Sequence, residues 1–391
     1  MDRTPTLTQA RGTRLFGKKV LALVLAGGKG SRMGPLTEHR AKPALPFAGT
    51  YKLIDFALSN CVNSGIFDVW VLEEYELHTL NDHLSNGRPW DLDRTYGGLR
   101  VLPPYTGGPE AEEGGFASGN ADAIYKQLPL LKDYAPDVLV VLSADHLYTL
   151  NLADVVEAHL RRKASITMVT TTVPPREDAT RFGNVVLEAN DRVKNFVYKP
   201  EKPVSDDITT EVFVYDVPTL VRTLERLERE QDDLEDFGHH LLPALVEEGQ
   251  AYAYRFRGYW RDVGLPEAYL NAHLDLLAGR GVDLAQPDWP LYTLTLPRPP
   301  ARIERGAVVE NSLVAPGCRV AGTVRRCVLG PDVTVEAGAT LDDCVLLGRT
   351  HVAAGVQLKR IIVDQDLDLP KNFQRLRTRG VEVLGAEQLK E

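Results

Sequence analysis

The chain has 391 residues, of which 43% are hydrophobic and 25% charged, and its formal net charge is -9. This length and composition are typical of a globular protein with two domains, and they exclude a disordered chain. The negative charge argues against nucleic acid as the main partner, although one local basic pocket can still bind a nucleotide. No apolar run approaches the roughly 18 residues of a membrane-spanning helix, so we expect no membrane association.

The first 19 residues form a basic N-terminal extension without the apolar stretch of a signal peptide, which predicts a cytoplasmic protein. The four cysteines show no C-x-x-C spacing, so we expect reduced, buried thiols rather than a metal site. They are Cys61, Cys318, Cys327 and Cys344.

An apolar run over residues 23–26 ends at three glycines within four residues, which are Gly27, Gly28 and Gly30. The pattern predicts a buried strand followed by a loop whose backbone N–H groups can bind an anion, with a triphosphate as the first candidate. A purely structural turn would also explain the glycines. Arg32 and Lys42 flank the loop, and these two cations favour the phosphate-binding interpretation because a structural turn does not require them.

Strand and helix patterns alternate over the following residues. We expect buried strands at 69–72 and 138–142, and helices at 51–65, 121–131 and 152–161. This order predicts an α/β fold, a Rossmann-like doubly wound domain over residues 20–285. Its ligand should bind beyond the carboxyl ends of the strands.

Two aspartates are candidate metal ligands. Asp145 follows the strand at 138–142 and should point into the same crevice as Arg32 and Lys42, although an aspartate in this position is often only a helix cap. Asp262 lies in a segment that reads as too polar for the core, and it offers a second carboxylate. Two carboxylates at one phosphate-binding cleft would form the oxygen site that Mg²⁺ prefers.

A proline-rich linker over residues 286–302 precedes a region with a different pattern. Apolar residues there recur every six positions, as at Val308, Val314 and Val320, with glycines between them. This period predicts a left-handed parallel β-helix, with a C-terminal tail, over residues 303–391, and two or three coils before Val363. The region has no titratable cluster, so we interpret it as an assembly and regulatory module.

Residues 23–66, LVLAGGKGSRMGPLTEHRAKPALPFAGTYKLIDFALSNCVNSGI, resemble the start of bacterial ADP-glucose pyrophosphorylases, also called glucose-1-phosphate adenylyltransferases. Further matches follow in the family's order at 90–94 (WDLDR), 101–105 (VLPPY), 145–148 (DHLY), 236–238 (DFG) and 259–264 (YWRDVG). The resemblance covers nearly the whole chain, and it implies that residues 20–285 form a nucleotidyltransferase domain. It implies transfer from ATP to glucose 1-phosphate with Mg²⁺, giving ADP-glucose and pyrophosphate for glycogen or α-glucan synthesis, by a homo-oligomer that is commonly a tetramer.

The resemblance also implies roles for individual residues. The three glycines would cradle the triphosphate, Arg32 would hold the departing pyrophosphate, Lys42 would contact the transferred phosphate, and Asp145 and Asp262 would carry Mg²⁺. Arg32, Lys42 and Asp145 are therefore the expected catalytic residues. The remaining nucleotide-binding candidates are Glu74, Gly119, Asn120 and Ala121, and the sugar-phosphate candidates are Tyr198, Lys199, Gly183 and Glu211.

This chain departs from the family where base and sugar would be recognised. Glu74 stands in place of an amide, and a carboxylate only accepts hydrogen bonds, whereas an amide also donates. Tyr198 replaces a glutamate before Lys199, and Glu211 lies in Thr-Glu-Val where the family has Ser-Met-Gly before the next strand. Two more departures lie nearby in the sequence, Phe116-Ala117 in place of an aromatic pair and Asn120 in place of threonine.

The charged groups for phosphate and metal are retained, whereas the groups that would recognise base and sugar are altered. We therefore expect an active transferase that uses ATP and glucose 1-phosphate. Two alternatives stay open. The first is the same chemistry with another nucleoside triphosphate, such as GTP, or another sugar phosphate, and the second is a non-catalytic regulatory subunit that modulates a catalytic homologue.

Overall fold

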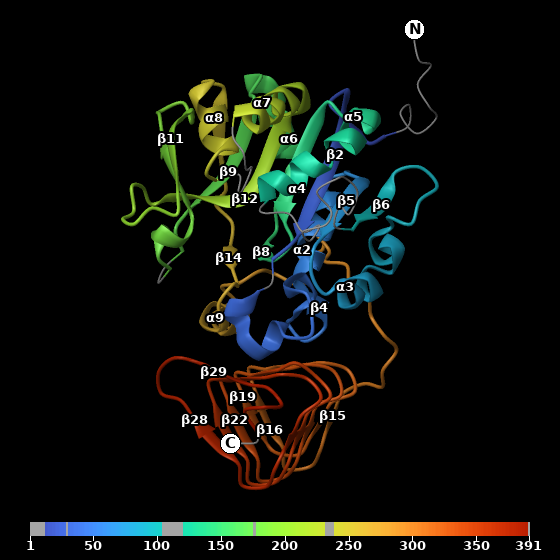
Figure 1. Cartoon of the computed structure of the whole chain (residues 1–391). Helices are drawn as coiled ribbons and strands as arrows, with labels where there is room; N and C mark the ends of the chain where they lie inside the picture. The colour runs from blue at the N-terminus through green and yellow to red at the C-terminus, as the bar shows by residue number, and fades with distance from the viewer. Residues whose placement is uncertain (1–11, 29, 104–119, 175–176, 231–237, 390–391) are drawn as a thin grey trace.

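The structure is a computed structural model, and it describes residues 12–28, 30–103, 120–174, 177–230 and 238–389. An α/β domain forms the upper part of the molecule in Figure 1, and a β-helix built from the C-terminal part of the chain lies below it. Residues 278–301 contain neither helix nor strand. The exact domain limits, with a linker at 286–302, stay a prediction.

A mixed sheet forms the centre of the α/β domain, in the order β11-β10-β12-β7-β2-β5-β6. Strands β2 (Lys18–Ala26), β5 (Asp68–Glu73), β6 (Gly98–Leu102) and β7 (Val138–Ser143) are parallel to their neighbours in this group. β2, β5 and β7 are buried almost throughout, as expected for strands covered on both faces. The predicted strands at 69–72 and 138–142 are thus confirmed, and so is the α/β class.

Further strands extend the sheet beyond β7. β12 (Asp207–Asp216) pairs antiparallel with β7 and with β9 (Ile166–Thr172), and β13 (Ala251–Arg255) pairs parallel with β9. The remaining strands of this domain are β1 (Arg14–Leu15), β3 (Pro46–Phe47), β4 (Tyr51–Lys52), β8 (His146–Tyr148), β10 (Gly183–Leu187), β11 (Val193–Tyr198) and β14 (Trp260–Asp262).

Helices pack on both faces of the sheet (Figure 1). The helix predicted at 51–65 is α2 (Leu53–Asn63), and the one at 152–161 is α6 (Leu152–Arg162). The pattern at 121–131 forms two helices, α4 (Asn120–Lys126) and α5 (Leu128–Tyr134), because Pro129 lacks an N–H and fits only a helical first turn. The others are α3 (Leu77–Leu84), α7 (Val217–Glu230), α8 (Leu241–Glu247), α9 (Pro266–Leu277) and the 3-10 turns η1 (Ser31–Thr37), η2 (Lys42–Ala44), η3 (Ser85–Trp90) and η5 (Ala179–Arg181).

The segment around Asp262 differs from the prediction, because it is not a polar stretch outside the core. It forms β14, which pairs with β8, and both Trp260 and Arg261 are buried. Arg261 can be buried because ion pairs with Glu177, at 3.1 Å, and Asp275, at 2.9 Å, neutralise its charge.

Residues 302–384 form three parallel sheets of five strands each, the arrangement of the predicted left-handed parallel β-helix. The chain makes five coils here, and four of them end at or before Val363, so the prediction of two or three coils before that residue was wrong. Strands of two or three residues are joined by turns of unequal length, and the stacking of Arg302, Arg319 and Thr334 gives coils of 17 and 15 residues. A strict six-residue count therefore misses coils. The strands are β15 (Arg302–Ile303), β16 (Val308–Glu310), β17 (Leu313–Val314), β18 (Arg319–Val320), β19 (Thr323–Arg325), β20 (Val328–Leu329), β21 (Thr334–Val335), β22 (Thr340–Asp342), β23 (Val345–Leu346), β24 (His351–Val352), β25 (Gln357–Lys359), β26 (Ile361–Val363), β27 (Asp368–Leu369), β28 (Gln374–Leu376) and β29 (Glu382–Leu384).

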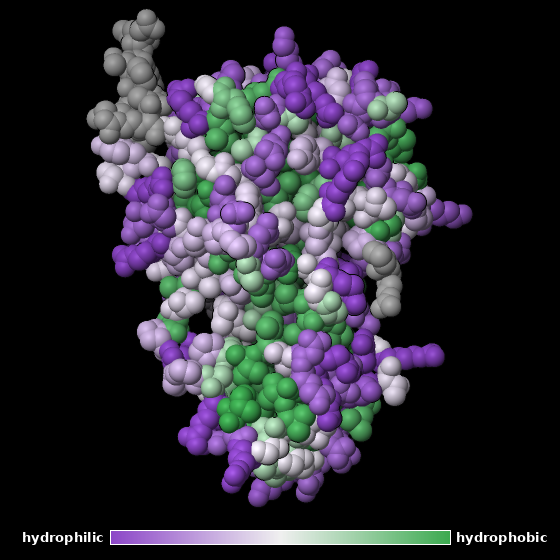
Figure 2. Space-filling model, turned by 180° about the vertical axis from the view of Figure 1, so that it is seen from behind, coloured by the Kyte–Doolittle hydropathy of each residue, from purple (hydrophilic) through white to green (hydrophobic). Residues whose placement is uncertain are grey.

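The two domains share an apolar contact. One hydrophobic cluster contains Met33 and Leu36 of η1 together with Val345 and Ile362 of the β-helix. A largely buried ion pair, Arg40 to Asp364 at 2.7 Å, also joins them. Figure 2 shows, from behind, hydrophobic residues gathered over the lower half of the molecule. The β-helix is therefore packed directly against the segment that follows the glycine loop.

Two smaller predictions concern the cysteines and the membrane. All four cysteines are free and buried, as predicted. Among the helices that the structure describes, none is long and apolar enough to cross a membrane.

Candidate active site

The glycine loop begins where β2 ends, between the carboxyl ends of β5 and β7. Gly28 and Gly30 adopt positive φ values of 99° and 61°, a region that favours glycine. Arg32 follows in η1, is exposed, and has no ion pair or side-chain hydrogen bond within the described part of the chain. The loop thus lies at the sheet edge where the sequence predicts a ligand, and Arg32 is free to contact one.

Lys42 joins the two predicted metal ligands. Its Nζ lies 2.5 Å from Asp145 Oδ2 and 3.5 Å from Asp262 Oδ1, and its side chain is only 8% exposed. Ser143 Oγ donates to Asp145 Oδ1 at 2.5 Å, and the Gly264 N–H donates to Asp262 Oδ1 at 2.8 Å. Residues from three distant parts of the sequence therefore meet at one point, as predicted.

Oppositely charged groups in this cluster stabilise each other's ionised forms. Burial disfavours ionisation of Asp145, but Lys42 and then His146 outweigh it and hold the pKa of this carboxyl well below its usual range. Asp262 behaves in the same way, with its pKa lowered mainly by Lys42 and His146 against the effect of burial. Burial likewise opposes the charge of Lys42, yet the two aspartates raise its pKa. All three groups are ionised near neutral pH.

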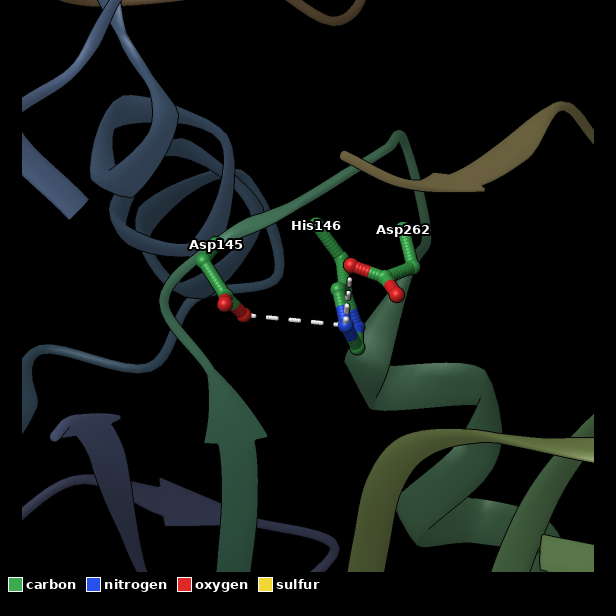
Figure 3. Close-up of side chains that lie close together, drawn as sticks. All are labelled: Asp145, His146 and Asp262. Carbon is green, nitrogen blue, oxygen red and sulfur yellow. Dashed lines mark ion pairs between the residues drawn. The ribbon is translucent and has the colours of Figure 1, made fainter. Parts of the chain in front are cut away.

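His146 completes a group that fits a divalent cation. Asp145, His146 and Asp262 each offer one ligand atom, and these atoms lie within 4.8 Å of one another. In Figure 3 the imidazole lies between the two carboxylates, with Nε2 at 3.6 Å from Asp145 and 3.8 Å from Asp262. The other ring nitrogen, Nδ1, must donate to the Thr210 carbonyl at 3.2 Å, because a carbonyl only accepts. Nε2 is therefore the ring nitrogen that faces the two carboxylates, whose oxygens suit a bound cation.

Arg181 is a site residue that the sequence reasoning missed. It lies in η5, and its guanidinium contacts Asp262 Oδ2 at 3.1 Å and Glu177 at 2.8 Å. The only signal in the sequence is that Arg181 stands two residues before Gly183, which the resemblance assigns to the sugar-phosphate site. The arginine adds a second positive charge beside the aspartates and holds Asp262 in place.

Glu74 lies directly on the glycine loop. Its half-buried carboxylate accepts a hydrogen bond from the backbone of Gly28, and a Cβ at Gly27 would overlap its Oε2 atom. Burial, followed by the nearby Asp122, raises the pKa of this carboxyl. One backbone donor of the predicted phosphate loop is therefore already bonded to an anion of the protein.

Glu73, the last residue of β5, was not singled out by sequence. It is 1% exposed, and burial raises the pKa of its carboxyl to about 7. Asn81 donates to Oε2 at 2.8 Å, whereas Oε1 has no hydrogen-bond partner among the described residues.

Three of the sugar-phosphate candidates, Gly183, Tyr198 and Lys199, are neighbours on β10 and at the end of β11. Gly183 and Tyr198 are paired residues of β10 and β11. Lys199 Nζ lies 2.5 Å from the Tyr198 hydroxyl and 4.3 Å from the centre of its ring. Gly238 packs against that ring so closely that a Cβ there would overlap it. Glu211 approaches the metal-ligand group, with Oε2 at 3.9 Å from His146 Nε2.

Some predictions fall on residues that the structure does not describe. Gly119 and the pair Phe116-Ala117 lie outside the described residues, and Asn120 and Ala121 are described only as the start of α4. Their assignment to the nucleotide site stays a prediction.

Comparison with known proteins agrees with this geometry. The model of the nucleotidyl transferase family matches residues 21–279, and that of the GlmU-like C-terminal hexapeptide matches residues 299–374. A protein of Thermotoga maritima named glucose-1-phosphate adenylyltransferase is 41% identical over 324 residues, which cover 82% of this chain and 76% of that protein. Proteins of the same name from Acetivibrio thermocellus and Bacillus thuringiensis are 36% and 38% identical, over 91% and 90% of this chain and 83% and 93% of theirs. The chain therefore belongs to the glucose-1-phosphate adenylyltransferase family.

Proposed function

We propose that this chain transfers the adenylyl group of ATP to α-D-glucose 1-phosphate, giving ADP-glucose and pyrophosphate for glycogen or α-glucan synthesis. The observation that carries the proposal is the meeting of Lys42, Asp145 and Asp262 beside the glycine loop. A regulatory subunit without activity would not need this buried cluster, which is why we favour an enzyme. The relatives named above support the choice of substrates.

The reaction needs no nucleophile from the protein. A phosphate oxygen of the sugar phosphate attacks the α-phosphorus of ATP, a new P–O bond forms, and the bond to the β-phosphate breaks to release pyrophosphate. Catalysis then consists of bringing two anions together in line and neutralising their charge.

The charged residues supply these functions. The glycine loop offers backbone N–H groups to the triphosphate, and the exposed Arg32 can bind the departing pyrophosphate. Lys42 is kept charged by its two aspartates, so it can donate to an oxygen of the transferred phosphate. Asp145 and Asp262 would hold Mg²⁺, whose charge would offset that of the phosphates. On the sugar side, Lys199 would bind the phosphate of glucose 1-phosphate.

One observation favours a second candidate, the same reaction with GTP. Glu74 places an acceptor-only carboxylate on the nucleotide loop, and guanine carries two adjacent donors, N1–H and its exocyclic amine, that match two carboxylate oxygens. Adenine offers only its amine at the corresponding edge.

The experiment is a substrate matrix. Purified protein is incubated with glucose 1-phosphate, Mg²⁺ and each nucleoside triphosphate in turn, and pyrophosphate release is measured. The fastest release with ATP supports the proposal, and the fastest release with GTP supports the second candidate. Size-exclusion chromatography with light scattering tests the further proposal, made by resemblance, that the chain forms a homotetramer.

A further inference from the structure

Glu211 sits at an irregularity in strand β12. The register between β12 and β9 shifts between Thr209 and Phe213, and Glu211 lies within this bulge with φ at 56°. A residue other than glycine is strained in this left-handed region, and bulges beside active sites commonly redirect a side chain. Nothing in the pairing of β12 with β7 requires the strain, since Val212 is in register with Leu142. The distortion therefore points to a function for the side chain that it directs.

The bulge directs the carboxylate toward the edge of the acidic cluster. Its Oε2 lies 3.9 Å from His146 Nε2, and 39% of the side chain is exposed, against 19% for Asp145 and 13% for Asp262. Glu211 is not a member of the group whose ligand atoms lie within 4.8 Å of one another. It is thus placed beside the metal-ligand residues rather than among them.

Neighbouring charges shift the pKa of Glu211 in opposite directions. Burial raises the pKa of its carboxyl most, and Asp145 and Asp262 raise it further, whereas His146 and Lys199 lower it. Glu211 is therefore close enough to interact electrostatically with two groups of residues. These are the aspartates, which handle phosphate and metal in the proposed function, and Lys199, which would bind the sugar phosphate.

The described residues that we assign to the sugar subsite are rich in donors and poor in acceptors. Lys199 Nζ and the Tyr198 hydroxyl are already bonded to each other, and a lysine ammonium has no acceptor to offer. Sugar hydroxyls need acceptors, and a carboxylate can accept from two neighbouring hydroxyls at once. Of the four residues that we assign to this subsite, Gly183, Tyr198, Lys199 and Glu211, only the last carries a carboxylate.

We propose that Glu211 determines the sugar specificity of this enzyme, its carboxylate accepting hydrogen bonds from hydroxyls of the sugar ring while Lys199 holds the phosphate. This inference rests on the proposed function, because it names the residue that selects one of the two substrates. A sugar 1-phosphate that lacks the bonded hydroxyl would leave a half-buried carboxylate unpaired, and the site would reject it.

The first test compares Glu211→Gln with wild type. The expected result is a rise in the KM for glucose 1-phosphate of about 10- to 100-fold, the usual loss for a charge-assisted hydrogen bond, with the KM for ATP changed less than about 2-fold. Glu247→Gln, the same change at an exposed position at the end of α8, is the matched control and should behave as wild type. An unchanged KM for glucose 1-phosphate overturns the proposal. So does a shift confined to the Mg²⁺ requirement, because it would make Glu211 a metal ligand.

A panel of deoxy and epimeric sugar 1-phosphates adds a test at the level of single hydroxyls. One analogue should lose at least about 10-fold in kcat/KM with wild type, and Glu211→Gln should show no such discrimination against it. If the variant rejects every analogue as strongly as wild type does, another residue selects the sugar and the proposal fails.

Glu211→Gly separates binding from folding. Glycine tolerates the positive φ, so this variant should melt at a higher temperature than wild type while it shows the same weakened binding of glucose 1-phosphate. Normal affinity in this variant contradicts the proposal. Calorimetric titration of wild type and variants with glucose 1-phosphate alone keeps the test independent of turnover. If wild type binds the sugar phosphate but releases no pyrophosphate with any triphosphate, the proposed function fails, whereas the role of Glu211 is still decided by the titration.

Discussion

The substitution Asp145→Asn removes one charge from the centre of the candidate active site and leaves its shape nearly unchanged. Asp145 accepts from Lys42 Nζ and from Ser143 Oγ, both at 2.5 Å. Asparagine keeps an acceptor for one of these donors but cannot bind a cation as a carboxylate does. Lys42 retains Asp262 at 3.5 Å, so its buried charge does not become unpaired.

These contacts set the expected magnitudes. We expect a loss of stability of about 1–3 kcal/mol, the value of a hydrogen bond to a charged group, rather than the larger penalty of a buried ion without a partner. Turnover should fall much further, by about 10²- to 10⁴-fold, because the lost charge acts where negative charge must be stabilised during transfer.

The assay measures initial rates of pyrophosphate release across Mg²⁺ concentrations, together with thermal unfolding. The variant should unfold cooperatively close to the wild-type temperature, with a reduced kcat and a raised Mg²⁺ requirement. Asp154→Asn, at an exposed position in α6, is the matched control and should leave both readouts unchanged. Wild-type turnover in Asp145→Asn would remove this residue from the catalytic machinery and refute the reasoning.

Three other residues give further predictions. Glu74→Gln should shift the ratio of ATP to GTP turnover toward ATP, because an amide can both donate and accept; an unchanged ratio would show that Glu74 does not read the base. The pKa of Glu73 is raised to about 7, so its protonation favours the folded state at low pH, and this contribution is lost as the pH rises from about 4.5 to 7. The free energy of unfolding of Glu73→Gln, relative to that of wild type, should therefore be about 2 kcal/mol higher at pH 8 than at pH 5. Denaturant unfolding at both pH values measures this, and an equal difference between variant and wild type at the two pH values would contradict the assignment. Arg40→Met should destabilise the contact between the domains by about 2–4 kcal/mol, because it leaves the largely buried Asp364 without its partner; unaltered thermal unfolding would show that this pair is not needed.

The sequence predicted the parts of the site that follow from strand order. Parallel strands end at the same sheet edge, so an apolar run followed by glycines and another followed by Asp145 had to meet. The sequence also predicted that Asp262 reaches this cleft, but it wrongly indicated that the segment around Asp262 is too polar for the core. The ion pairs that allow Arg261 to be buried come from residues distant in the sequence.

Other features depend on tertiary contacts that no local pattern records. Arg181 belongs to the site only because η5 brings it within 3.1 Å of Asp262. The raised pKa of Glu73 depends on its burial in the folded domain, which its neighbours in sequence do not reveal. The bulge at Glu211 also has no local signal, since glutamate carries no preference for a positive φ.

Identification of the product tests the central claim most directly. Purified chain incubated with ATP, glucose 1-phosphate and Mg²⁺ should form ADP-glucose, identified by chromatography and mass spectrometry, in a one-to-one ratio with released pyrophosphate. Formation should stop when the divalent cation is chelated. Absence of ADP-glucose under these conditions, from protein that is folded and binds ATP, would contradict the account.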